Sequence, residues 1–66
     1  MALQEGQAVR TTAEVTGDDG KRVIPAGTPG VVMYVYGDGE AYAVDVKIDD
    51  QFDNVYATAE QVEPVS

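Results

Sequence analysis

The 66-residue chain contains no His, no Cys and no Trp, and it carries only four Lys and Arg residues against twelve Asp and Glu residues. Without Cys or His the chain has no disulfide framework, no thiolate or imidazole metal site, and no Ser-His or Cys-His nucleophile. Nucleic acid and anionic membranes are disfavoured as partners, because binding to either depends on Lys and Arg. The sequence therefore predicts a protein that is not an enzyme, takes no cofactor, and binds neither nucleic acid nor membrane.

Leucine and long apolar runs are also scarce. There is one Leu against eleven Val, and Val loses rotamer freedom in a helix but packs well on a pleated sheet. The longest apolar run spans residues 31–36, which is far too short for a membrane span, and residues 1–6 lack the basic and apolar regions of a signal peptide. We expect a cytoplasmic all-β protein with a single domain over residues 1–66, in which residues 1–5 form a disordered tail.

The chain is apolar enough to fold, but only just. Val, Ile, Leu and Phe make up 15 of the 66 residues, slightly above the roughly one-fifth below which a strongly charged chain is expected to be disordered. A domain of this size buries only about 60% of its unfolded surface and is marginally stable. This balance favours a well-closed sheet, a partner, or both.

Turn residues divide the chain into short strands. Residues 7–15 alternate, with Val9, Thr11, Ala13 and Val15 on one face, and a long loop over residues 16–28 follows. Residues 31–36 and 42–48 then flank Asp38-Gly39, and Asp-Gly is a leading signal for a two-residue type I′ hairpin turn.

The hairpin turn fixes which side chains share a face. A turn at Asp38-Gly39 sets Val35 opposite Tyr42 and Met33 opposite Val44. The predicted core face then contains Val31, Met33, Val35, Tyr42, Val44 and Val46. The predicted outer face contains Val32, Tyr34, Tyr36, Ala41, Ala43 and Asp45.

The last third of the chain predicts one more strand, a helical turn and a closing strand. The strand spans residues 55–57, Thr58 caps the helical turn with Gln61 at the reciprocal position, and Val62 and Val65 return to the core. Five short strands, a long loop after the first and one short helical turn before the last are the layout of a small five-stranded SH3-like barrel.

A sequence resemblance points to the same fold. The pattern Gly-x-x-Gly-Val-Val-x-x-Val over residues 27–35, followed by residues 38–46, resembles a family of small bacterial SH3-like barrel proteins of unknown function. The end of the chain, residues 55–65, is similar to the end of that family, and the resemblance covers about residues 6–65. More distantly, the chain is similar to SH3-like accessory subunits that dock redox partners in photosynthetic electron transfer. The resemblance implies an all-β barrel and no catalytic residues.

The predicted partner-binding surface is the outer face of the hairpin. Tyrosine gives a large contact area at low entropic cost and is enriched at interfaces. The candidate residues are Val32, Tyr34, Tyr36, Ala41 and Ala43, with Glu40 at their border. Either this face is exposed or the loop over residues 16–28 covers it, and the sequence leaves both arrangements open.

The acidic composition indicates the kind of partner. A surface with net charge −8 attracts basic proteins, with steering that weakens as salt rises. We expect a non-catalytic protein-binding or adaptor module with a basic protein partner, and the apolar face also allows a homodimer. The alternative is an acidic inhibitor or immunity-type decoy that masks a basic surface of a target enzyme.

One acidic segment has the spacing of a calcium-binding loop. Asp49, Asp53 and Glu60 fall at positions 1, 5 and 12 of an EF-hand-like loop, and they would be the metal ligands if Ca²⁺ bound there. However, residues 55–57 are predicted to form a strand, and no helices flank the loop. We therefore predict a solvated acidic loop and no metal site.

Overall fold

The protein is built from strands and turns. The computed structural model describes residues 3–17, 20 and 22–65. Along the chain its strands are β1 (Ala8–Thr11), β2 (Val15–Thr16), β3 (Val23–Ile24), β4 (Pro29–Tyr36), β5 (Ala41–Ile48), β6 (Gln51–Thr58) and β7 (Val62–Pro64). The all-β class predicted from the valine content is confirmed.

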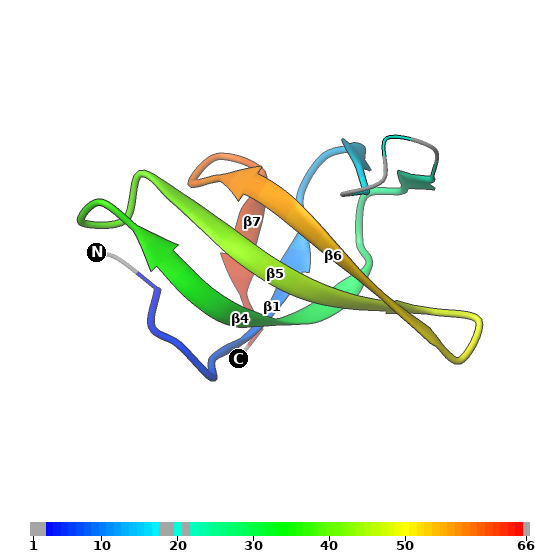
Figure 1. Cartoon of the computed structure of the whole chain (residues 1–66), viewed down its shortest axis with the longest axis horizontal. Coiled ribbons are helices and arrows are strands. Elements are labelled where there is room, and N and C mark those ends of the chain that lie inside the picture. Colours follow the sequence, from blue (N-terminus) through cyan, green and yellow to red (C-terminus); the bar gives the residue numbers. More distant parts are fainter. Residues whose placement is uncertain (1–2, 18–19, 21, 66) are drawn as a thin grey trace.

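Five of the strands form one antiparallel sheet in the order β6-β5-β4-β1-β7, and β2 and β3 form a separate two-stranded ribbon. In Figure 1 the long strands β4, β5 and β6 lie in front, and β1 and β7 cross behind them. Side chains from both layers make up the core: Val9, Val15, Ile24, Val32, Tyr42, Val44, Val46, Val55, Ala57 and Val62. The opposite face of β4, β5 and β6 is therefore an outer face.

The predicted closed barrel is not found. Among the described residues, strand pairing leaves β6 and β7 as the two edges of the five-stranded sheet. In the part of the chain that the structure describes, Gly17, directly after β2, forms one isolated bridge to Val55 on β6. The strands of the ribbon are two residues each, because the turn residues of this segment interrupt any longer strand.

The predicted helical turn over residues 58–61 is not seen either. Thr58 belongs to β6, and residues 59–61 form a turn in which Gln61 N donates to Thr58 O at 2.9 Å. Thr58 N in turn donates to Gln61 Oε1 at 2.9 Å. The predicted contact between Thr58 and Gln61 exists, but β7 begins at Val62 and leaves no room for a helix. Val62 is buried as predicted, whereas Val65 is exposed.

The predicted first strand is broken. β1 ends at Thr11 and β2 begins at Val15, so the segment between them is not a strand. Val9, Thr11 and Val15 are buried as predicted, but Ala13 is exposed. Thr12 bends the chain toward the 59–61 turn, because its hydroxyl donates to Glu60 O at 2.6 Å and its N donates to Gln61 O at 2.8 Å.

The β4–β5 hairpin has the predicted register near its turn but not the predicted turn. Val35 lies opposite Tyr42, as expected. A type I′ turn at Asp38-Gly39 requires positive φ at both residues, whereas here the positive values are at Gly37 (60°) and Gly39 (103°). The connection is a four-residue loop over residues 37–40, closed by Glu40 N donating to Tyr36 O at 3.1 Å.

A β-bulge at Met33 changes the faces of β4. Val32 pairs with Val44 and Tyr34 pairs with Ala43, so Met33 is an extra residue in the strand. Val32 is completely buried, whereas Met33 is 52% exposed and Val31 is also exposed. The predicted core positions of Val31 and Met33 and the predicted outer position of Val32 are therefore wrong. One inserted residue shifts the alternation of every residue before it.

The long loop over residues 16–28 packs on the inner side of the sheet. Ile24 is in the core, and Thr11 Oγ1 donates to Pro25 O at 2.8 Å and accepts from Thr28 N at 3.0 Å. Arg22 lies 3.0 Å from Asp53 Oδ2 on β6. The described part of the loop is thus anchored to β1 and β6 from within.

Candidate functional site

Three tyrosines gather on the outer face of β4, β5 and β6. Tyr34 on β4 lies opposite Ala43 on β5, and Ala43 lies opposite Tyr56 on β6. Tyr36 lies opposite Ala41 in the next row. We call the surface formed by Tyr34, Tyr36, Ala41, Ala43 and Tyr56 the tyrosine face.

The rings of the tyrosine face contact one another, along β4 and across β5. The ring centroids of Tyr34 and Tyr36 are 4.9 Å apart in an edge-to-face arrangement, and those of Tyr36 and Tyr56 are 5.4 Å apart. Alanine at positions 41 and 43 leaves the space through which rings from β4 and β6 meet. The three tyrosines are nevertheless 53%, 42% and 61% exposed, in chain order. The face is a preassembled aromatic surface open to solvent.

The structure places the predicted partner-binding residues in different environments. Tyr34 and Tyr36 are exposed, and Glu40 is exposed in the hairpin loop. Ala43 is half-buried, Ala41 is buried on the outer face, and Val32 is buried on the core side because of the bulge. Val32 is therefore not part of the surface. The described part of the 16–28 loop does not cover the tyrosines.

Sequence reasoning missed Tyr56, although a signal was present. Residues 55–57 were expected to form a strand, and Val55 and Ala57 are buried. Because side chains alternate along a strand, Tyr56 must face away from the core. What the sequence could not show is that β6 lies beside β5, which brings Tyr56 to the tyrosines of β4.

A shallow hollow continues the outer face beyond the tyrosines. It has a volume of about 210 Å³ and is lined by Pro29, Gly30, Val31, Asp45, Lys47 and Phe52. Lys47 Nζ lies 5.9 Å from the centre of the Phe52 ring. Asp45 lines the hollow on the side of the tyrosine face, since it follows Ala43 by two residues and precedes Lys47 by two on β5.

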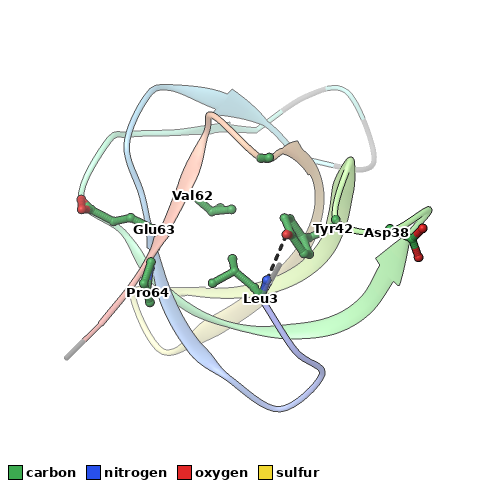
Figure 2. A pocket seen from close by; sticks show the side chains of 8 residues that line it. Leu3, Asp38, Tyr42, Val62, Glu63 and Pro64 are labelled. Atoms are coloured by element: carbon green, nitrogen blue, oxygen red, sulfur yellow. Dashed lines mark hydrogen bonds between the residues drawn. The ribbon is translucent and has the colours of Figure 1, made fainter. Parts of the chain in front are cut away.

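A larger cavity of about 470 Å³ lies near the N-terminal segment and the hairpin loop (Figure 2). Leu3, Tyr42 and Val62 converge in it, whereas the carboxylates of Asp38 and Glu63 point away from them. Leu3 N donates to the Tyr42 hydroxyl at 3.1 Å, and Leu3 packs against the core. The cavity wall therefore combines apolar side chains with the polar groups of Tyr42, Asp38 and Glu63.

The structure does not bring Asp49, Asp53 and Glu60 together. Asp49 lies in the β5–β6 turn, Asp53 lies on β6 beside Arg22, and Glu60 follows the other end of β6. An extended strand advances about 3.4 Å per residue, so Asp53 and Glu60 are separated by most of the strand's length. No group of three or more potential metal ligands occurs among the described residues.

The positively charged side chains of the described residues contact carboxylates or an aromatic ring. Arg10 Nε lies 3.2 Å from Glu63 Oε1, and Arg22 lies beside Asp53. Lys47 is on the outer face over Phe52. Most carboxylates of the described residues therefore have no ion-pair partner within that part of the chain.

Comparisons of the chain with protein-family models, with curated proteins and with solved structures find no match. No helix in the described part of the chain is long and apolar enough to cross a membrane.

Proposed function

We propose that the protein is a non-catalytic binding module that docks a basic protein on the tyrosine face. The observation that carries this proposal is the cluster of three contacting tyrosine rings that remain largely exposed. Apolar and aromatic surface of this kind costs free energy in water, and contiguous patches of it mark contact sites. Tyrosine is also among the residues enriched at interface anchors.

The charge of the molecule favours a basic partner over a second copy of the chain. Two copies with formal charge −8 repel each other, whereas a basic protein is attracted to the same surface. Electrostatic attraction of this type raises the association rate and falls with ionic strength. A second copy of the chain, as in the homodimer suggested by the sequence, is thus less favoured than a basic protein as the partner bound at the tyrosine face.

Membership of the SH3-like family and a cytoplasmic location remain parts of this proposal. The long connection between β1 and β4, and the return of β7 to pair with β1, support the family resemblance. The four-residue hairpin loop and the open edges at β6 and β7 are departures from the predicted layout.

The decoy alternative makes a different use of the surface. A decoy that masks a basic enzyme surface would bind mainly through carboxylates such as Asp49, Asp50 and Glu60, which are exposed at the ends of β6. Its binding would weaken steeply with salt and would not depend on tyrosine side chains.

The test compares partner capture and self-association by three proteins: the wild type, the variant Tyr34→Ala/Tyr36→Ala, and the control Glu14→Gln. Glu14 is exposed and lies outside every strand, so the control changes charge without touching the face. We expect the wild type and the control to retain a basic protein at low salt and the double variant to lose it. Capture that is unchanged in the double variant and abolished by salt would support the decoy instead. If the wild type elutes from gel filtration at the volume of a dimer and the double variant elutes at the volume of a monomer, the tyrosine face forms a homodimer.

A further inference from the structure

The outer face of β4, β5 and β6 carries a single carboxylate. Side chains on this face of β5 are Ala41, Ala43, Asp45 and Lys47, and β6 contributes Phe52, Asn54, Tyr56 and Thr58. From β4 the face receives only uncharged residues. Asp45 is therefore the one anionic group on this face, and Lys47 is its one cation; the other residues are aromatic, small or neutral.

The Asp45 carboxylate lies near the tyrosine face. Asp45 is directly opposite Val31 on β4 and Asn54 on β6, and Tyr56 is two residues beyond Asn54 on the same face. Side chains in such a diagonal relation across antiparallel strands are about 7–8 Å apart at their Cβ atoms, within reach of a long or aromatic group. One ligand group can thus touch both the carboxylate and the Tyr56 ring.

The Asp45 carboxylate has no partner within the described part of the chain. It makes no ion pair or hydrogen bond there, although it is half-buried. Lys47, two residues away on the same face, instead places its ammonium group over the Phe52 ring. A half-buried carboxylate without a cation, beside exposed aromatic rings, has the chemistry of a cation-binding position.

We propose that the anchoring group of the basic partner is an arginine side chain, which stacks on Tyr56 and donates hydrogen bonds to Asp45. This inference rests on the proposed docking function. Guanidinium is planar and weakly hydrated, so it stacks on an aromatic ring while its edge donates to a carboxylate. Lysine is a compact, strongly hydrated charge and gains less from such a site.

The test uses three blocked tripeptides as probes: glycyl-arginyl-glycine, glycyl-lysyl-glycine and glycyl-citrullyl-glycine. Each is titrated into the full chain while backbone amide NMR signals are recorded. We expect the arginine probe to shift the signals of Asp45, Tyr56 and their neighbours, and the lysine probe to bind at least about twofold more weakly. The citrulline probe, which keeps the shape but lacks the charge, should cause no comparable shift.

Variants separate the two contacts. Asp45→Asn and Tyr56→Leu should each weaken binding of the arginine probe about two- to fivefold, the range for exposed ion-pair and cation–π contacts. Tyr56→Phe should bind as the wild type does, because the ring is retained. Glu14→Gln controls for lost charge, and Phe52→Leu controls for loss of an aromatic ring elsewhere on the outer face.

The outcomes distinguish this inference from the proposed function. Equal binding of the arginine and citrulline probes, shifts confined to the acidic turns, or no binding at all would overturn the arginine site. If the arginine site fails but Tyr34→Ala/Tyr36→Ala still abolishes capture of the basic partner, the docking function stands with another anchor. If that double variant captures the partner normally, the docking function itself is wrong.

Discussion

At the scale of single residues, Gly30 shows how tightly the sheet is packed. A Cβ atom added at Gly30 would lie 2.7 Å from the backbone O of Asp45 and 2.9 Å from Cγ1 of Val44. Neither atom can move freely, because one is backbone and the other belongs to the completely buried Val44. The glycine is therefore required by space rather than by backbone conformation.

We expect Gly30→Ala to lower the free energy of unfolding by about 1–3 kcal/mol, the usual cost of overpacking. Urea unfolding of the purified variant measures it. Gly27→Asn is the comparison, because nothing lies within 4 Å of a Cβ at Gly27, so that any loss of stability there comes from the positive φ of 85° and not from crowding. A Gly30→Ala protein as stable as the wild type would contradict the observed packing.

Thr11 is the residue that holds the long loop to β1. Its buried hydroxyl donates to Pro25 O and accepts from Thr28 N. We expect Thr11→Val, which keeps the shape of the side chain, to lower the free energy of unfolding by about 1–3 kcal/mol, because it leaves the Thr28 N–H without its hydrogen-bond acceptor. Thr16→Val on the exposed side of β2 should change the unfolding free energy by less than about 0.5 kcal/mol. Equal effects of the two substitutions would contradict this role of Thr11.

At the scale of elements, the bulge in β4 decides which residues form the core. We expect Val32→Ala to lower the free energy of unfolding by about 2 kcal/mol, since it removes two buried carbon atoms and leaves a cavity. Met33→Ala, at the exposed bulge position, should cost less than about 1 kcal/mol. Chemical unfolding of both variants compares them directly. If Met33→Ala lowers the free energy of unfolding more than Val32→Ala does, the bulge is contradicted and the regular alternation predicted from the sequence is favoured.

Some features of the strands could be predicted from the sequence, and others could not. Valine content and turn residues predicted the all-β class and the pairing of Val35 with Tyr42. Alternation is a local signal, so it could not reveal the extra residue at Met33, which depends on how β4 curves over the core. Nor could it reveal that β6 joins β5 and brings Tyr56 to the tyrosine face, because strand order is a long-range property. The closed barrel and the helical turn were wrong for the same reason: local patterns do not fix where strands stop pairing.

At the scale of the whole molecule, negative charge is the dominant electrostatic feature. Self-repulsion in a compact chain of formal charge −8 opposes folding, and salt screens it. We expect the melting temperature to rise by several degrees between about 0.01 and about 0.5 M NaCl. In a domain this small, a change of about 1 kcal/mol in the free energy of unfolding shifts the melting temperature by roughly 4–8 °C. Thermal unfolding followed by circular dichroism tests this, and a melting temperature that falls with NaCl would contradict it.

The same charge and the tyrosine face together lead us to propose that a basic protein docks on the outer face of β4, β5 and β6. Site-specific photo-crosslinking tests this claim most directly, with a benzophenone amino acid placed at Tyr34 in one protein and at Glu14 in a control. We expect the probe at Tyr34 to form a covalent adduct with a basic protein, in a yield that falls as salt rises, and the probe at Glu14 to form none. Equal adducts from both positions, or an adduct at Tyr34 only with a second copy of the chain, would contradict the claim.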